Sequence, residues 1–189
     1  MRVVVIIPPV PVVTAEEARR HLRLDDDEQD LLIDGYIAAA TAHIDGPDGW
    51  LGRAIGEQTL VAHGELFRED PVRLPYPPVV SIEKVEYQDA QGAWQTLDAG
   101  AYELRGDQLG SSWGTRWPPT RAYRGAAETV RVTYRAGYAT VPPPVRVAIL
   151  MMVADMYRNP GEAGGAATAQ KAAISTPVEK LLAPFRVYS

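Results

Sequence analysis

The sequence predicts an α+β protein, with a helical-bundle body and an inserted antiparallel β-rich subdomain at about residues 55–135. Two observations carry this prediction. Apolar residues recur at helical spacing on both sides of the insertion, whereas the insertion has short runs of Val, Tyr, Thr and Trp between Gly, Pro and Asp clusters. In the stretch VPPPVRVAILMMVADMYRNP at 141–160, three prolines begin a helix and no charge lies between Arg146 and Asp155. The expected helices span about 14–23, 27–45, 142–158 and 176–182.

Composition limits the classes of function. The chain has 189 residues, of which 46% are hydrophobic, and it has no cysteine. This is enough for a core without metals, and the lack of cysteine excludes disulfides, thiolate catalysis and cysteine-based zinc sites. The net charge of −5 gives no basic footprint for DNA. The opening MRVVVIIPPVPVV lacks the features of a signal peptide, and no stretch reaches the ~20 apolar residues of a membrane span. We therefore expect a protein used in a cytoplasm, or in a particle assembled there, without a membrane partner.

The chain divides into four expected regions. Residues 1–13 form an extended N-terminal arm, 14–54 and 136–160 the helical body, 55–135 the β-rich insertion, and 161–189 a flexible loop followed by a C-terminal docking tail.

The N-terminal part begins with a strand and two helices. The run VVVII at 3–7 is expected to pair as an edge strand, on this chain or on a partner, and Pro8 ends it. Thr14 and Glu17 match a capping box. The acidic run at 25–28 fits a metal or docking site, but a helix N-terminus is favoured because carboxylates complement the helix dipole. The helix that follows is expected to bury an apolar stripe made of Ile33, Ile37, Ala40 and Ile44. Three neighbouring residues are expected to widen this stripe: Leu32, Tyr36 and Ala39.

Six strands are expected in the insertion, at 57–67, 79–87, 93–97, 101–105, 108–112 and 129–135. Turns at Asp89–Gly92 and Arg105–Asp107 are expected to close two hairpins. A change of apolar phase within 79–87 predicts a β-bulge. The last strand is expected to turn three side chains inward and three toward water: Val130, Val132 and Tyr134, against Arg131, Thr133 and Arg135.

The helix at 142–158 is apolar on nearly all sides. Its side chains fall on two faces: Val145, Ile149, Met152 and Met156, and Val147, Leu150, Ala154 and Tyr157. Such a helix must be covered on nearly all sides. Two interpretations stay open, a helix between its own domain and a neighbouring subunit, and a fully buried core helix. The residues proposed for a subunit interface are Val145, Ile149, Met152, Met156, Tyr157, Trp113 and Trp117.

The C-terminal segment ISTPVEKLLAPFRVYS follows a small, flexible stretch at 159–168. Ser175 or Thr176 is expected to cap its short helix. An aromatic, basic peptide after a linker is typical of a docking arm. A tail folded back on its own domain is the alternative.

Catalytic motifs are lacking. His21, His43 and His63 form no compact metal or acid–base motif, and no serine lies in a GxSxG or SxxK context. We predict no catalytic, cofactor-binding or metal-binding residue, and no cofactor. Trp113 and Trp117 lie among Arg and Pro in SSWGTRWPPTRAYRG, which favours packing or an interface over stacking on bases or sugars.

Four segments follow one another in order: TAEEARRHLRLDDDEQDLLIDGYIAAATAHID, LPYPPVVSIEKVEYQDAQGAWQTL, VRVTYRAGYATVPPPVRVAILMMVADMYRNP and VEKLLAPFRVYS. In this order they resemble the head–tail connector (adaptor) proteins of long-tailed bacteriophages and of gene transfer agents. The resemblance covers about residues 14–189. Its most specific parts are the block ending in MYRNP and the LLAPFR ending.

The resemblance implies a structural part and not an enzyme. Such proteins form a dodecameric ring of identical subunits beneath the portal protein, in the neck of a virion or gene-transfer particle. The ring extends the DNA channel, lets double-stranded DNA pass without sequence-specific binding, and offers a platform for a stopper or tail protein. The C-terminal segment reaches the portal, and the implied anchors are Leu181, Leu182, Phe185, Arg186 and Tyr188. The alternative function is a carbohydrate- or peptide-binding β-module that uses the Trp113/Trp117 segment.

Overall fold

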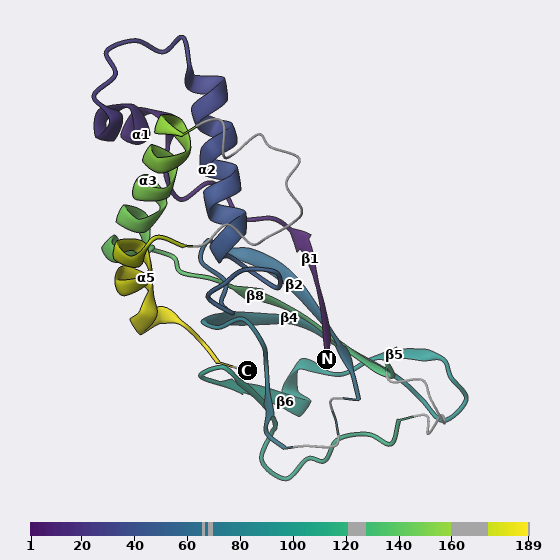
Figure 1. Ribbon diagram of the computed structural model, residues 1–189. Helices are drawn as coiled ribbons and strands as arrows, with labels where there is room; N and C mark the ends of the chain where they lie inside the picture. The colour runs from purple at the N-terminus through teal and green to yellow at the C-terminus, as the bar shows by residue number, and fades with distance from the viewer. Residues whose placement is uncertain (66, 68–69, 121–127, 160–173, 189) are drawn as a thin grey trace. The chain divides into compact units, whose positions relative to one another are not determined.

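The computed structural model (Figure 1) describes residues 1–65, 67, 70–120, 128–159 and 174–188. The chain forms two compact units, and each unit combines two stretches of sequence. Unit 1 consists of Met1–Val10 and Gly56–Tyr138, and unit 2 of Pro11–Ile55 and Ala139–Ser189. The described strands lie in unit 1 and the described α-helices in unit 2, which confirms the α+β class.

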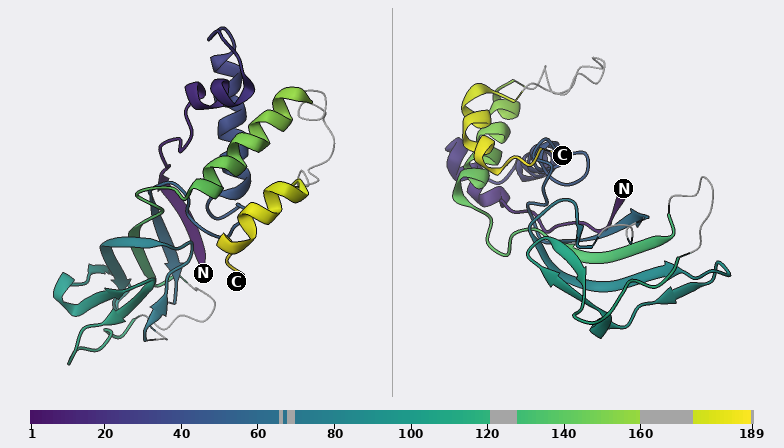
Figure 2. Two further views of the ribbon diagram at one scale, coloured as in Figure 1. Left: turned by 90° about the vertical axis from the view of Figure 1, so that its left-hand side faces the viewer. Right: turned by 90° about the horizontal axis from the view of Figure 1, so that it is seen from below.

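Unit 1 contains two antiparallel sheets (Figure 2). The five-stranded sheet has the order β1 (Arg2–Ile7), β2 (Gln58–Gly64), β8 (Val130–Ala136), β4 (Val79–Gln88) and β5 (Trp94–Thr96). The three-stranded sheet has the order β3 (Val72–Arg73), β7 (Gln108–Ser111) and β6 (Tyr102–Arg105), and the short 3₁₀ helix η2 (Ala99–Ala101) precedes β6. The short strand β3 was not among the expected strands, because two residues give no alternation to read.

Turn chemistry explains the two hairpins. At Asp89–Gly92, the Ala93 and Gln91 N–H groups donate to the Asp89 carboxylate, and this turn joins β4 to β5. At the turn between β6 and β7, Gly106 has a φ of 62°, a left-handed conformation that glycine adopts without strain. Both predicted turns are confirmed. The register of β4 against β8 shifts twice, between Val79 and Ser81 and again further along, so the predicted bulge is also confirmed.

The core of unit 1 is aliphatic around one buried tyrosine. Its most buried side chains include Leu60, Val85, Leu109, Val132 and Tyr134, all at 0% exposure. The Tyr134 hydroxyl donates to the Pro75 carbonyl oxygen at 2.8 Å, so this buried polar group has its partner.

One expectation for β8 was wrong in part. Thr133 was expected to face water beside Arg131 and Arg135, but only 9% of it is exposed. Val61 of β2 and Lys84 of β4 lie on either side of it in register, and these neighbours cover the short threonine side chain.

Unit 2 contains α1 (Ala15–Leu22), α2 (Asp30–Ile44), α3 (Pro143–Arg158), α5 (Thr176–Leu182) and the 3₁₀ helix η3 (Ala183–Phe185). Helix α3 packs against α1, α2 and α5, and α1 also packs against α2. Figure 2 shows α3 and α5 side by side. None of the described helices is long and apolar enough to cross a membrane.

Helix α2 confirms its predicted stripe and corrects its predicted start. Ile33, Ile37, Ala40 and Ile44 are at most 3% exposed. The helix begins at Asp30, three residues after the expected start at 27, and its N-cap Gln29 makes no side-chain hydrogen bond. Leu32 is 48% exposed and Ala39 is also exposed, so these two do not widen the buried stripe as expected.

Some expectations concern residues outside the described ranges. The flexible stretch at 159–168 lies outside them except for Asn159, and the end of the SSWGTRWPPTRAYRG segment lies outside them from residue 121 onward.

Candidate interaction surfaces

Helix α3 has a buried face and a half-open face. The buried side chains are Val145, Ala148, Ile149, Val153 and Ala154. On the other side Val147 is 43% exposed, and Leu150 and Met151 are half-buried. The interpretation as a fully buried core helix is therefore wrong, because one face belongs to the core and the other leaves apolar atoms at the surface. That a neighbouring subunit covers the second face stays a prediction.

The residues proposed for a subunit interface on this helix separate into two groups. Val145 and Ile149 are 1% and 0% exposed, so the chain itself covers them. Met152, Met156 and Tyr157 are half-buried and remain accessible in part.

Local chemistry fixes both ends of α3. Pro143 and Pro144 lie at its first positions, where a missing N–H leaves no helical hydrogen bond unmade. At the other end the Asn159 side-chain amide donates to the Asp155 carbonyl oxygen at 3.2 Å.

The described part of the C-terminal segment is tied to residues 50–53 of its own unit. The Arg53 Nε donates to the Phe185 carbonyl oxygen at 2.7 Å, and the Val187 N–H donates to the Leu51 carbonyl oxygen at 2.8 Å. The Arg186 guanidinium lies 4.1 Å from the centroid of the Trp50 ring. These contacts agree with a tail folded back on its own domain.

The five proposed portal anchors differ in exposure. Leu182 is 0% exposed and belongs to the core of unit 2. Leu181, Phe185 and Arg186 are half-buried, whereas Tyr188 is 78% exposed. The Arg186 guanidinium also lies 4.8 Å from the centroid of the Tyr188 ring, so the same arginine contacts two aromatic rings.

The two tryptophans of the SSWGTRWPP segment do not form one aromatic platform. Trp113 is 98% exposed. Trp117 is half-buried and stacks on Phe67, with ring centroids 4.5 Å apart and an interplanar angle of 6°. Trp117 is thus a packing residue, and Trp113 presents its ring to solvent.

A row of ionisable side chains crosses one face of the five-stranded sheet. Arg2 of β1 lies opposite His63 of β2, which lies opposite Arg131 of β8, which lies opposite Glu86 of β4. Because directly opposite residues share a face, these four side chains form one line.

Each arginine of this row has a bidentate carboxylate partner. Arg2 donates to Glu128 at 2.7 and 2.8 Å, and Arg131 donates to Glu86 at 2.8 Å through two nitrogens. The hydrogen bond from Arg131 lowers the pKa of Glu86, against the opposing effect of burial. Burial, and after it the charges of Arg2 and Arg131, lower the pKa of His63. The arginines of the row are therefore neutralised and do not form a free cationic strip for phosphate.

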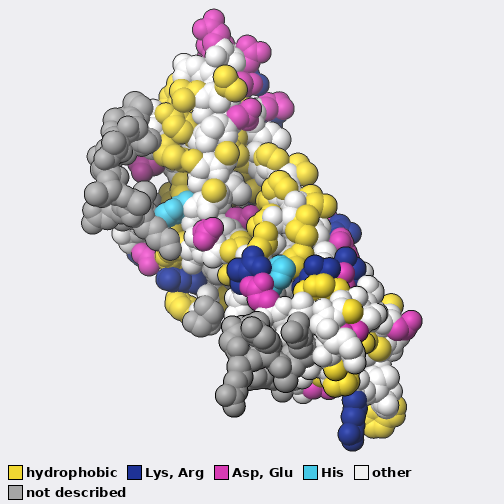
Figure 3. Space-filling model, turned by 90° about the vertical axis from the view of Figure 1, so that its right-hand side faces the viewer, with side chains coloured by type: hydrophobic (Ala, Val, Ile, Leu, Met, Phe, Trp, Pro, Cys, Tyr) yellow, Lys and Arg dark blue, Asp and Glu magenta, His cyan; other side chains and the backbone are white. Residues whose placement is uncertain are grey.

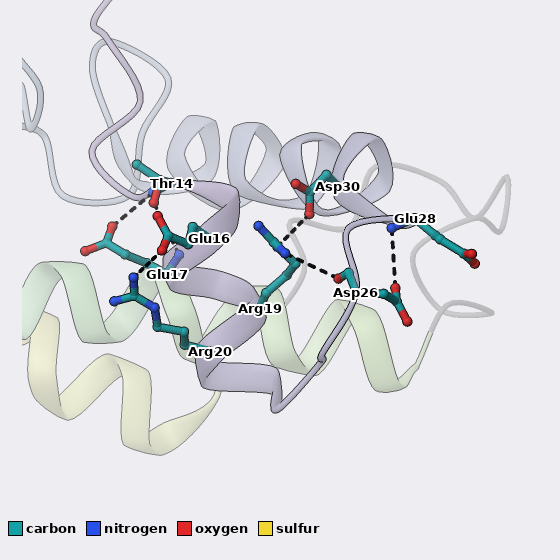
Figure 4. A network of polar contacts seen from close by, with 8 residues as sticks. All are labelled: Thr14, Glu16, Glu17, Arg19, Arg20, Asp26, Glu28 and Asp30. Atoms are coloured by element: carbon teal, nitrogen blue, oxygen red, sulfur yellow. Dashed lines mark hydrogen bonds and ion pairs between the residues drawn. The ribbon is translucent and has the colours of Figure 1, made fainter.

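Helix α1 begins with the predicted capping box (Figure 4). The Glu17 N–H donates to Thr14 Oγ1 at 3.2 Å, and the Thr14 N–H donates to the Glu17 carboxylate at 3.0 Å. The hydrogen bond from the Thr14 backbone lowers the pKa of Glu17. Arg146 of α3 also pairs with Glu17, which links the two helices.

The acidic run at 25–28 forms a turn and not a cap. The Glu28 N–H donates to the Asp26 carboxylate at 3.3 Å, and Arg19 of α1 pairs with Asp30 at 2.9 Å across this turn (Figure 4). The described residues contain no group of three or more His, Asp or Glu side chains that could hold a metal ion. The acidic run thus lies in the connection between α1 and α2, just before the helix that it was expected to cap.

Exposed apolar side chains gather in patches on the molecular surface (Figure 3). The largest set in unit 1 belongs to β1, where Val4, Val5, Ile6 and Ile7 are between 37% and 57% exposed. In the sequence, the unbroken apolar run at 3–7 was the signal for this exposed strand, but the pattern alone did not tell whether the rest of the chain would cover it.

Comparison with known proteins gives a match of fold. No family model matches the chain, and no curated protein matches it. Among solved structures, the chain matches one in the neck of an empty gene transfer agent particle computed with C6 symmetry, with a TM-score of 0.76 and 21% identity, over 100% of this chain and 97% of that one. It also matches chains in the virion of a native gene transfer agent particle (TM-score 0.73, 21% identity) and in the neck of a native particle computed with C12 symmetry (TM-score 0.72, 20% identity), with the same coverage. The chain therefore has the fold of a protein found in the neck of gene transfer agent particles, and the resemblance inferred from its sequence is confirmed for the fold.

Proposed function

We propose that this protein is a structural subunit of the neck of a virion or gene transfer particle, with the role of a head–tail connector. The observation that carries the proposal is the agreement of fold over 100% of this chain and 97% of the neck protein, at a TM-score of 0.76. Agreement over both full lengths supports a shared architectural role more strongly than a match of one module.

In this role identical subunits form a ring beneath the portal, with twelve copies as the expected number. The neck structures with the same fold were computed with C6 and C12 symmetry, which supports such a ring. A cyclic ring needs two different contact surfaces on each subunit. The half-open face of α3, with Val147, Leu150 and Met151, supplies one of these contact surfaces, and the helices of unit 2 form the helical-bundle body that carries it.

The ring extends the DNA channel and carries the stopper or tail protein. A channel must let the duplex slide, and each cationic contact with a phosphate adds affinity that opposes sliding. The net charge of −5 and the neutralised arginines of the ionisable row in unit 1 agree with this requirement.

The C-terminal segment contacts the portal through its exposed end. Tyr188 and the half-buried Phe185 and Arg186 offer an aromatic and cationic surface of the kind enriched at interfaces. Leu182 acts indirectly, because its burial holds α5 in place.

The carbohydrate- or peptide-binding module is less well supported. An aromatic platform needs neighbouring rings that are free, and Trp117 is stacked on Phe67. Of these two tryptophans, Trp113 is the exposed one, and a single ring does not make such a platform.

Electron microscopy of the protein mixed with its cognate portal protein tests the role. We expect rings stacked on the portal. Tyr188→Ala is expected to weaken portal binding by about tenfold or more, as for an interface tyrosine, whereas His21→Ala, an exposed change on α1, leaves it unchanged. Absence of rings both alone and on the portal contradicts the role. Saturable glycan binding that Trp113→Ala abolishes supports the alternative instead.

A further inference from the structure

Strand β1 is apolar on both faces and lies at the open edge of its sheet. Five of its six residues are Val or Ile, and the burial pattern shows one half-buried and five exposed positions. Continuous apolar strands are typical of sheet interiors, where neighbours cover both faces. Among the described residues β1 pairs with β2 alone, so its outer backbone groups have no strand beside them.

The usual means of protecting an edge strand are scarce here. Natural edges carry Lys, Pro or inward-pointing charges, which oppose pairing with another chain. Residues 3–7 contain none of these, and Pro8 comes only after the strand has ended. The one charge, Arg2, is paired with Glu128. Only the irregular register between Val5 and Ile7 interrupts the edge.

Within the described part of the chain, no strand lies beyond β5 at the opposite edge of the same sheet, and this edge carries an exposed aromatic side chain. All three residues of β5 are exposed, and 40% of Trp94 is accessible. The Arg131 guanidinium lies 4.2 Å from the centroid of the Trp94 ring, and Glu86 holds that guanidinium through two hydrogen bonds. The Trp94 side chain is thus held in place before any partner arrives, which lowers the entropic cost of a contact.

The two edges have a defined relative direction. Four successive antiparallel pairings lead from β1 through β2, β8 and β4 to β5, so β5 runs in the same direction as β1. Copies in a twelvefold ring differ by a rotation of about 30°. This small rotation preserves strand direction, so β1 of one copy can meet β5 of the next in parallel, and the contact is head-to-tail as a closed ring requires.

We propose that β1 of one copy pairs edge to edge with β5 of the neighbouring copy, so that the unit 1 sheets join and the β1 side chains pack beside Trp94. This inference rests on the proposed ring and names one of its contacts. The occupant of the open β1 edge is a second copy of this chain.

Cysteine cross-linking tests the pairing, because the chain has no cysteine of its own. In the double variant with Val4→Cys and Gln95→Cys, the two thiols of one copy lie on opposite edges of a five-stranded sheet, about 19 Å apart at ~4.8 Å per strand. A short bismaleimide therefore joins only different copies. We expect a ladder of dimers, trimers and larger products, for the protein at high concentration or mixed with its portal.

The controls identify other modes of contact. Each single variant is expected to give no cross-linked product. The pair Leu31→Cys with Gln95→Cys is also expected to give none, because Leu31, 88% exposed on α2, is accessible to the reagent but lies outside the proposed contact. Dimers from Val4→Cys alone mean that two β1 strands pair with each other, and this overturns the proposal. Absence of a ladder in both conditions also overturns it.

A charge variant separates this inference from the proposed function. Ile6→Lys changes a side chain that is 55% exposed, so the fold tolerates it. Because a lysine on an edge strand opposes pairing with another chain, we expect a loss of rings on the portal of about tenfold or more. Leu31→Lys is the matched control and keeps the rings. If Ile6→Lys forms rings as well as the unmodified protein does, the β1–β5 contact is wrong and the ring role stands. If the ladder forms but no rings appear on the portal, the contact stands and the ring role is wrong.

Discussion

Two substitutions on α3 separate the core from the proposed subunit contact. Ile149 is 0% exposed and Val147 is 43% exposed, although both lie in the same charge-free run two residues apart. We expect Ile149→Ala to destabilise the protein without any direct effect on assembly. We expect Val147→Ala to leave stability almost unchanged and to weaken ring formation.

The magnitudes follow from burial. Ile149→Ala removes three buried carbon atoms at about 0.8 kcal/mol each and leaves a cavity, so the expected cost is about 3–4 kcal/mol. Val147→Ala removes two half-exposed carbons, which costs about 1 kcal/mol at most. The better helix propensity of alanine offsets about half of this. The net change is expected to lie within about 0.5 kcal/mol.

Urea unfolding followed by far-ultraviolet circular dichroism measures the first effect, because unit 2 holds the described α-helices. Counting rings on the portal by electron microscopy measures the second. A loss of less than about 1 kcal/mol for Ile149→Ala refutes the burial described for this face. Unchanged ring formation by Val147→Ala refutes the assignment of the half-open face to a subunit contact.

Two further predictions concern unit 1. Arg131 lowers the folded-state pKa of Glu86, so the stability from this pair is present above the ordinary pKa of 4.5 and is lost as the pH falls through the lower folded pKa. In Glu86→Gln this acid-dependent loss of stability should shrink. Urea midpoints measured between pH 6 and about 3 follow it. A Cβ at Gly137 would lie 2.1 Å from the Gly56 carbonyl oxygen at a φ of 118°, so Gly137→Ala should lower the free energy of unfolding by at least about 2 kcal/mol. The control Gly106→Ala, with a φ of 62° and open space around its Cβ, should lower it by only about 1 kcal/mol. Equal urea midpoints for the two variants would contradict the close approach at Gly137.

Local signals predicted most elements of the fold well. Thr14 and Glu17 fixed the start of α1 because a capping box depends only on residues three apart. Helix α5 has the expected bounds, 176–182. The start of α2 was missed by three residues, because the carboxylate of Asp26 bonds the backbone of its own turn instead of capping the helix.

The interaction surfaces were harder to predict, because exposure depends on what packs from elsewhere in the chain. Val145 and Ile149 looked as available as Met152 and Met156, since all four share a helix face by spacing. In the fold the first two are enclosed and the other two are half open. Trp113 and Trp117 likewise formed a single candidate in sequence, and Phe67, 50 residues before Trp117, separated them by stacking on one.

The sequence by itself determined where most of the strands, helices and turns lie, because these follow from periodicity and from contacts between residues a few positions apart. It also carried the order of segments whose resemblance agrees with the fold found in the neck of gene transfer agent particles. Only the tertiary structure decided which apolar side chains remain at the surface. The run VVVII is equally apolar wherever it lies, and its position at the edge of the sheet, with β2 as its one neighbouring strand among the described residues, leaves its side chains exposed.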